Sequence, residues 1–321
     1  MDKEKQIGLL LLNMGGPDCI DSVKPFLQNL FKDRDIIRLG PAFLQRPIAT
    51  IIINRRLKKT IHAYNLIGGK SPLPEITSQQ AKELQRLLDE QYRGKFIVSV
   101  GMRYWHPFIE DALTEFKNKA IDEVIGLSLY PQYSKATTGS TIKVFEKACK
   151  KLSLSYKSIT SWFDNPLYID SLVEIINEGF KKFNHTPYVL FSAHNLPKKF
   201  IDAGDPYVKH TEVTVKMVVD KLKIQNWSLA YQSKTGPVKW LEPTTDDKIK
   251  QLAKQDIKDI LLVPISFVSD HIETLYEIDM LYKEMANSMG INLTRTESLN
   301  TRKTFIHALK RLVLIKCQKE F

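Results

Sequence analysis

The chain has 321 residues, enough for about two domains, and 43% of them are hydrophobic while 26% are charged. This is the composition of an ordinary soluble globular protein. The formal net charge of +11 favours an acidic ligand or an anionic membrane surface. Nucleic acid would also suit this charge, but the sequence contains no zinc-finger spacing, RNP-like motif or long basic run, so no nucleic-acid partner is predicted.

The cysteines are sparse. Cys19, Cys149 and Cys317 include no CxxC pair and cannot build a disulfide framework, which indicates a reducing compartment and predicts a cytoplasmic protein. The first apolar run, 7–12, is too short for a signal peptide and is followed by no small-residue cleavage pattern. The other apolar runs are far shorter than the roughly 20 residues that a membrane helix needs.

From the N-terminus onwards, short apolar runs alternate with helical patterns, which predicts repeated βα units and parallel sheets. Strands are expected at 7–13, 96–102, 123–129, 156–161, 187–193, 228–232, 259–265 and 291–296. Helices are expected at 20–31, 76–91, 108–118, 138–150, 166–182, 208–223, 245–255, 271–288 and 302–317.

The two halves of the chain repeat one pattern. The strand and turn at 122–131 resemble those at 258–267, and the strands before them also agree. We predict an α/β fold in which two similar Rossmann-like domains, each with a parallel sheet, face each other across a cleft. The expected domains are 1–157, 158–300 and, for a C-terminal helix, 301–321.

The first half contains additional material at about 40–73. Two apolar runs, 41–44 and 48–53, are followed by the basic cluster 55–59. Apolar residues beside a basic cluster are typical of a segment that lies at a membrane interface. The alternative is a core helix with a solvated basic end.

One histidine stands at a position where ligands bind. The expected strand at 187–193 is buried and delivers His194 at its C-terminal end. In open α/β sheets, ligands bind outside the carboxyl ends of the strands. A lone histidine is usually a structural residue, but this position favours a functional one.

Three acids follow the strand expected at 259–265. Asp270, Glu273 and Glu277 are spaced so that they share one face of the predicted helix, and Ser269 or Asp270 is expected to cap that helix. Such a line without interleaved Lys or Arg suggests metal or proton sites. The alternative is an acidic first turn that complements the helix dipole.

These two segments resemble the ferrochelatases, and other family-like stretches occur in the family's order from about residue 8 to about residue 300. The stretches are Leu11–Pro17, Gly68–Leu73, Met102–Pro107, Tyr130–Ser134, Thr137–Ser140, Gly204–Tyr207 and Tyr231–Leu241. The resemblance implies an enzyme, a lyase, that inserts ferrous iron into a porphyrin in the last step of haem biosynthesis. It also implies the same two-domain arrangement, a last helix that packs on the first domain, and a porphyrin-pocket lip at about 40–73.

This reaction requires a base for the two pyrrole N–H protons, a weak open metal site and a proton exit. His194 suits the base because a neutral imidazole has a pKa near ~6.5 and also ligates Fe²⁺. Glu273 is its expected partner at the metal, and the resemblance places both at catalytic positions. Asp270 and Glu277 are expected to extend a proton or metal path, with His271 beside it.

The porphyrin is expected to meet further side chains. Met14 follows the first expected strand and is predicted to approach the other face of the ring, with a core methionine as the alternative. Trp240 and Phe267 are suited to stack on the ring. The resemblance adds further residues that bind propionates or line the pocket: Arg55, Arg56, Tyr64, Ser71, Arg103, Tyr104 and Ser233.

Departures from family variants narrow the expectation. Some ferrochelatases hold a [2Fe–2S] cluster with one mid-chain and three C-terminal cysteines. Here Lys135 occupies the mid-chain position and only Cys317 is near the C-terminus, so no iron–sulfur cluster or other permanent cofactor is predicted, and Fe²⁺ is a substrate. Met14–Pro17 differs from the Tyr-Gly-Thr-Pro-like run of coproporphyrin-type enzymes, which favours protoporphyrin IX.

The residues leave three alternative functions to consider. A coproporphyrin III ferrochelatase or another tetrapyrrole metal chelatase would share these motifs, because several divalent ions suit such a site. A haem carrier on the same fold would not need His194 together with the acids. A nucleotide-binding protein is disfavoured, because no GxGxxG follows any expected strand.

The lip also predicts peripheral attachment to the inner face of an anionic membrane.

Overall fold

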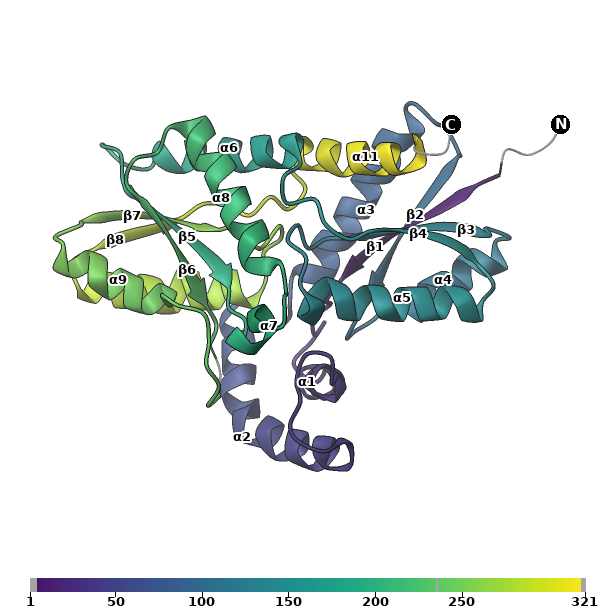
Figure 1. The fold of residues 1–321 in the computed structure, drawn as a ribbon, viewed down its shortest axis with the longest axis horizontal. Coiled ribbons are helices and arrows are strands. Elements are labelled where there is room, and N and C mark those ends of the chain that lie inside the picture. Colours follow the sequence, from purple (N-terminus) through teal and green to yellow (C-terminus); the bar gives the residue numbers. More distant parts are fainter. Residues whose placement is uncertain (1–4, 235, 319–321) are drawn as a thin grey trace. The chain divides into compact units, whose positions relative to one another are not determined.

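The computed structural model describes residues 5–234 and 236–318. These residues form two compact units. The first unit contains the chain up to Ser161 together with the part from Ile306, and the second contains Trp162–Phe305. Each unit is an α/β structure around its own four-stranded parallel sheet (Figure 1).

The sheet of the first unit has the strand order β2-β1-β3-β4. Its strands are β1 (Ile7–Asn13), β2 (Phe96–Met102), β3 (Glu123–Ser128) and β4 (Ser155–Ile159). Its helices are α1 (Val23–Lys32), α2 (Gln45–Leu66), α3 (Leu73–Asp89), α4 (Ile109–Asn118) and α5 (Ser140–Lys151), with short turns η1 (Ala42–Leu44) and η2 (Lys135–Gly139). The central strand β1 is buried on both faces between its neighbours.

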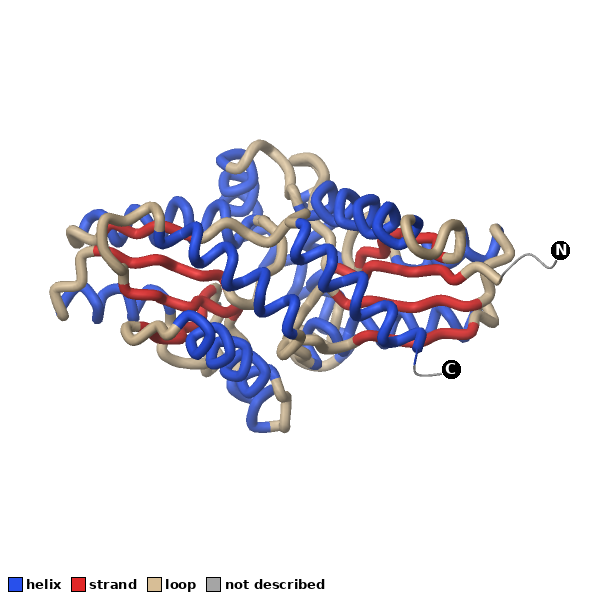
Figure 2. The backbone as a smooth tube through the Cα atoms, turned by 90° about the horizontal axis from the view of Figure 1, so that it is seen from above, coloured by secondary structure: helices blue, strands red, loops and turns tan. Residues whose placement is uncertain are grey.

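The sheet of the second unit has the corresponding order, β6-β5-β7-β8. Its strands are β5 (Tyr188–His194), β6 (Trp227–Gln232), β7 (Asp259–Pro264) and β8 (Asn292–Arg295). Its helices are α6 (Pro166–Phe180), α7 (Lys198–Asp202), α8 (Tyr207–Leu222), α9 (Thr245–Lys254), η3 (Glu273–Tyr282) and α10 (Lys283–Ser288). Figure 2 shows the strands of each sheet side by side with helices over them.

The last helix, α11 (Lys303–Gln318), begins in the second unit, and its residues from Ile306 belong to the first. Within the first unit, Lys310 Nζ donates a hydrogen bond to the Leu87 carbonyl at 2.8 Å. Residues 319–321 of the expected terminal helix and residues 1–4 of the expected first domain lie outside the described residues. In the part of the chain that the structure describes, no helix is long and apolar enough to cross a membrane.

The expected α/β class and the two similar parallel sheets are confirmed, and every expected strand is present within about two residues of its predicted bounds. One helix prediction was wrong in kind. The helix expected at 271–288 is a wider π-helical segment, η3, followed by α10. The helix expected at 138–150 is present as α5, and the π-turn η2 precedes it. Such widened turns depend on tertiary contacts and are frequent at functional sites.

The segment at 40–73 contains a long helix that the periodicity did not predict. In α2, Ala49 and Ile53 are buried with Phe31 of α1, whereas Ile51 is 53% exposed and Phe43, in the preceding turn η1, is 78% exposed. The alternative of a core helix thus holds for one side of α2, and the membrane-interface interpretation stays a prediction. One side of α2 belongs to a small core, and the other presents apolar side chains to solvent.

Candidate active site

The topology of the second sheet brings three strand ends together. β5 lies between β6 and β7, and all three run parallel, so the residues after them meet at one edge of the sheet. His194 ends β5, and its backbone N–H donates to Ser266 Oγ, just after β7, at 2.8 Å. The Tyr207 hydroxyl donates to the His194 carbonyl at 2.9 Å. The histidine backbone is therefore fixed on both sides.

The His194 ring is paired with Glu273, the first residue of η3. His194 Nδ1 lies 2.8 Å from Glu273 Oε2, and the two side chains are 34% and 24% exposed. Burial acts to lower the pKa of His194, but the Glu273 carboxylate outweighs it and raises that pKa above its usual value. Burial acts to raise the pKa of Glu273, but the neighbouring His194 lowers it. The structure thus joins the two residues that the sequence proposed as partners.

Ser233 links this pair to Glu277. The serine follows β6 with a left-handed backbone, φ 72°, and its N–H donates to Glu277 Oε1 at 3.1 Å. Its hydroxyl lies 3.0 Å from Glu273 Oε2 and also contacts Glu277 Oε2. The Tyr282 hydroxyl donates to Glu277 Oε1 at 2.8 Å. Burial and the nearby Glu273 charge raise the pKa of Glu277.

Asp270 has hydrogen-bond partners of its own, and its place in the expected line of three acids stays a prediction. Its Oδ1 accepts hydrogen bonds from Arg295 Nη1 at 3.0 Å and Ser298 Oγ at 2.7 Å, and its Oδ2 accepts one from Asn300 at 2.9 Å. Burial acts to raise the pKa of Asp270, but the Arg295 charge and these hydrogen bonds lower it. Asp270 precedes η3, and residues from β8 and the loop after it bind the carboxylate.

The expected helix cap is wrong. Ile272 occupies the position before η3 and makes no side-chain cap, and the Thr274 hydroxyl oxygen accepts from the His271 N–H at 3.0 Å. Ser269 and Asp270 lie further upstream; the Ser269 carbonyl lies 3.1 Å from His271 Nδ1.

Phe267 lies between two histidine rings. Its ring centroid is 4.4 Å from that of His271 and 6.1 Å from that of His194. Burial lowers the pKa of His271. Among residues 5–234 and 236–318, no group of three or more His, Cys, Asp or Glu side chains is arranged to hold a metal ion.

Arg103, in the first unit, is bound to a buried acid that the sequence reading missed. Arg103 Nη2 and the Tyr104 hydroxyl each donate to Asp33 Oδ2 at 2.7 Å, and the Ser140 hydroxyl donates to the same oxygen. Asp33 is 8% exposed and Tyr104 is 3% exposed. The charge of Arg103, expected to face a propionate, is thus already paired. Asp33 ends α1, 70 residues away, and no local pattern links it to Arg103.

Met14 lies directly after β1 and is partly exposed. Its carbonyl accepts a hydrogen bond from the Tyr104 N–H at 3.0 Å. The next two residues turn the chain. Gly15 has a φ of +85°, and a Cβ at Gly16 would lie 2.5 Å from the Ser71 side chain. Met14 is thus held beside Tyr104.

The other expected porphyrin contacts differ in exposure. Ser71 and Tyr64 are only 5% and 4% exposed, and the Ser71 N–H donates to the Pro17 carbonyl at 2.7 Å. Arg55 and Arg56 are fully on the surface of α2. Trp240 is half-buried beside Pro197, and its indole nitrogen has no hydrogen-bond partner.

Solved structures of chelatase type share this fold over nearly the whole chain. SirB from Bacillus subtilis with Fe³⁺ matches with a TM-score of 0.57 at 10% identity, covering 98% of this chain and 97% of that one. CbiX, described as the terminal enzyme for biosynthesis of siroheme in denitrifying bacteria, matches with a TM-score of 0.52 at 10% identity, covering 96% and 98%. The fold is that of the α/β chelatases.

Comparison with known sequences identifies the family of chelatases to which the chain belongs. The ferrochelatase family matches residues 6–316. The ferrochelatase of Desulfotalea psychrophila is 47% identical over 96% of both chains, and that of Aquifex aeolicus is 49% identical over 95% of this chain and 98% of its own. The chain therefore belongs to the ferrochelatase family. It is a lyase of haem synthesis that acts on a porphyrin and iron.

Proposed function

We propose that this ferrochelatase inserts Fe²⁺ into protoporphyrin IX to give protohaem, with His194 as the proton acceptor. The observation that supports this most is the His194–Glu273 contact of 2.8 Å through Nδ1. When Nδ1–H donates to the carboxylate, the Nε2 lone pair is free to accept a pyrrole proton. The carboxylate then stabilises the imidazolium that forms.

A proton leaves by a path already joined by hydrogen bonds. The Ser233 hydroxyl contacts both Glu273 and Glu277, yet it carries one proton. A protonated Glu277 satisfies this geometry, because it donates to the serine while the serine donates to Glu273. The raised pKa of Glu277, caused by burial and by Glu273, favours that form. The proposed path runs from His194 through Glu273 and Ser233 to Glu277: Glu277 first releases its own proton to solvent, the Ser233 hydroxyl then donates to the Glu277 carboxylate, and Ser233 accepts the proton that Glu273 has taken from His194.

In this proposal Asp270 acts indirectly. It is bound to Arg295 and accepts from the Thr274 hydroxyl, next to Glu273, at 3.1 Å. It therefore holds the start of η3 rather than passing protons or iron. His194 and Glu273 are the proposed transient ligands of Fe²⁺, and two ligands leave positions open for the pyrrole nitrogens.

For the porphyrin, Phe267 and Trp240 remain the proposed stacking residues, and Met14 with Tyr104 the proposed contacts from the first unit. Arg55 and Arg56 are exposed and free to bind carboxylates. Arg103 is paired with Asp33, so we propose that it meets a propionate through a hydrogen bond rather than as a free charge. Ser71 and Tyr64 support the turns around them.

The porphyrin can be identified directly. Anaerobic incubation of the protein with Fe²⁺ and either protoporphyrin IX or coproporphyrin III, followed by absorbance, should give a higher kcat/KM for protoporphyrin IX. A preference for coproporphyrin III would overturn the proposed substrate and leave the chemistry of His194 intact. Binding of haem without metal insertion into either porphyrin would instead indicate a carrier.

We also propose that the enzyme holds no iron–sulfur cluster. Lys135 is exposed on η2. Cys149 is fully buried in the hydrophobic core of the first unit, and Cys19 is exposed near the start of α1. The purified protein, free of porphyrin, should be colourless. Stoichiometric sulfide with a [2Fe–2S] absorbance or EPR signal would contradict this.

Peripheral attachment of a cytoplasmic enzyme to an anionic membrane is the remaining proposal. Phe43, Leu44 and Ile51 are exposed around the start of α2, and Arg55 and Arg56 follow within the helix. Each buried apolar side chain contributes on the order of 1 kcal/mol or more, and each basic residue near anionic lipid about 1 kcal/mol. Ile52, which the sequence suggested as a fourth anchor, is partly buried against the small core of Phe31, Ala49 and Ile53.

Vesicle co-sedimentation tests this attachment. We expect binding to anionic vesicles at low salt that falls as salt is added, and weaker binding of the Arg55→Ser/Arg56→Ser variant. The matched control is Lys150→Ser/Lys151→Ser, which removes an adjacent exposed basic pair from the end of α5. Equal losses in both variants would show that net charge alone drives binding.

A further inference from the structure

Arg295 contacts the chain on both sides of the two active-site acids Glu273 and Glu277. It is the last residue of β8, where Leu262 of β7 is its neighbour in the sheet, and its side chain is 10% exposed. The N–H of the next residue, Thr296, donates to the Leu262 carbonyl at 3.0 Å. The sheet therefore fixes the point from which the guanidinium extends.

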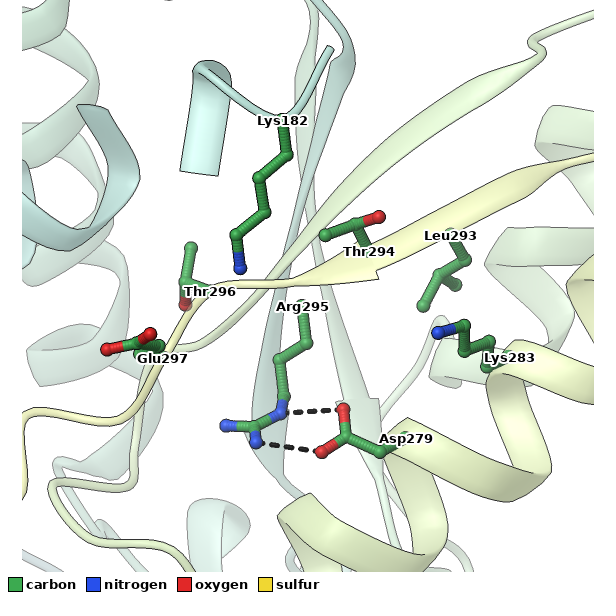
Figure 3. Close-up of a pocket in the computed structure, with 8 residues that line it drawn as sticks. All are labelled: Lys182, Asp279, Lys283, Leu293, Thr294, Arg295, Thr296 and Glu297. Atoms are coloured by element: carbon green, nitrogen blue, oxygen red, sulfur yellow. Dashed lines mark hydrogen bonds and ion pairs between the residues drawn. The ribbon is translucent and has the colours of Figure 1, made fainter. Parts of the chain in front are cut away.

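The guanidinium divides its N–H groups between two carboxylates. Nε and Nη2 each donate to one oxygen of Asp279 at 2.8 Å, and Figure 3 shows the Arg295 side chain extending from the end of β8 toward Asp279. Nη1 donates to Asp270 Oδ1 at 3.0 Å and to Ser298 Oγ at 3.2 Å. A planar guanidinium has donors in fixed directions that suit this arrangement, whereas a lysine ammonium lacks them.

The two carboxylates lie on either side of the active-site acids. Asp270 is three residues before Glu273, and Asp279 is two residues after Glu277. Asp279 is part of the π-helical segment η3, whereas Asp270 precedes it. Arg295 thus ties the chain before η3 and a residue within η3 to one strand end.

The winding of η3 decides how Glu273 and Glu277 lie relative to each other. π-helices are rare and occur mostly at functional sites, so such a segment depends on contacts from the rest of the fold. Here the Ser233 hydroxyl contacts both carboxylates, and Glu273 Oε2 also lies 2.8 Å from His194 Nδ1. A change of winding would move at least one acid away from these partners, and a displacement of about 1 Å can slow a reaction by about 10²-fold.

We propose that Arg295 is a positioning residue for metal insertion, which preserves the winding of η3 that brings Glu273 to His194. The same winding keeps Glu277 within reach of Ser233. The inference rests on the proposed function, because it gives Arg295 a role only through the two acids. A side chain that merely stabilised the fold would change the folded fraction and leave the turnover of the folded protein unchanged.

The test compares Arg295→Gln with Arg302→Gln in the full-length protein. Arg302 is the matched control, because its side chain is 19% exposed and binds three carboxylates of the same unit, those of Glu174, Glu178 and Glu297. Anaerobic metallation of protoporphyrin IX with Fe²⁺ gives kcat and KM, and circular dichroism gives the folded fraction. We expect both variants to be destabilised, but only Arg295→Gln to lose kcat, by about tenfold or more, with KM little changed.

A milder variant keeps the inference testable if Arg295→Gln does not fold. Asp279→Asn removes the charge of a carboxylate that is 37% exposed, and it leaves Asp270 paired with Arg295. Its control is Glu178→Gln, which removes a carboxylate charge, 44% exposed, from Arg302. We expect kcat to fall in Asp279→Asn and to stay at the wild-type value in Glu178→Gln.

Combination with Glu273→Gln separates this inference from the proposed function. The proposed proton path passes through Glu273, so Asp279→Asn should cause little further loss of kcat in the Glu273→Gln background, whereas independent effects would multiply. Multiplied losses overturn the inference. So does a wild-type kcat for Asp279→Asn, or an equal loss of kcat in Arg295→Gln and Arg302→Gln. Normal turnover by Glu273→Gln alone would instead overturn the proposed catalytic pair, and with it the target on which Arg295 acts.

Discussion

Replacement of His194 by alanine should lower kcat by roughly 10²–10⁴-fold while the protein stays folded. The imidazole is the group whose free Nε2 takes the pyrrole proton in the proposed mechanism, and its Nδ1 is held by Glu273 at 2.8 Å. The side chain is 34% exposed, so its removal leaves no large cavity in the core. Anaerobic porphyrin metallation assays beside thermal melting measure both effects.

The matched control is His185→Ala. His185 precedes the same strand, is 65% exposed and pairs with Asp259 at 3.1 Å, so its loss should leave turnover unchanged. Glu273→Gln keeps the shape of the partner and removes its charge, and it should lose activity to a similar extent. Near-normal turnover by folded His194→Ala protein would contradict the assignment of the base.

The place of His194 at a ligand-binding strand end could be predicted from the sequence, because it depends only on local features of the chain. A short buried strand ends at this residue, and parallel strands expose their carboxyl ends to ligands. Its partner Glu273 followed from the chemistry that metal insertion requires. The same reasoning found the eight strands, because each is a short apolar run bounded by turns.

Other parts of the site depend on contacts between distant segments. Asp270 shares the spacing of a helix face with Glu273, yet Arg295 from β8 binds it, and no periodicity within 270–277 reveals that partner. The role of Tyr282 as the hydrogen-bond donor to Glu277 similarly depends on the π-helical geometry of η3. The α2 helix was missed because its apolar residues do not form a single stripe, since some of them face solvent.

Asp33 is the clearest example of a residue whose role depends on contacts with distant segments. Its replacement should have a large effect on the stability of the protein. Asp33→Asn should lower the free energy of unfolding by about 3 kcal/mol at pH 7, because it leaves the Arg103 guanidinium, 20% exposed, without its acid. It also weakens the hydrogen bonds from Tyr104 and Ser140. Urea unfolding followed by circular dichroism measures the difference. Asp35→Asn is the control, because Asp35 pairs with Lys143 on the surface and should contribute at most about 1 kcal/mol.

The pH dependence distinguishes a charge effect from a packing effect. Burial acts to raise the pKa of Asp33, but hydrogen bonds from Ser140 and Tyr104 and the charge of Arg103 lower it below its usual value. A carboxyl whose pKa is lower in the folded state stabilises the fold fully above its unfolded pKa, about 3.9, and loses that contribution as the pH falls through the folded value. The gap between wild type and Asp33→Asn should therefore be largest near neutral pH and shrink in acid. A gap that stays constant down to acid pH would show that the carboxylate charge is not what holds Arg103.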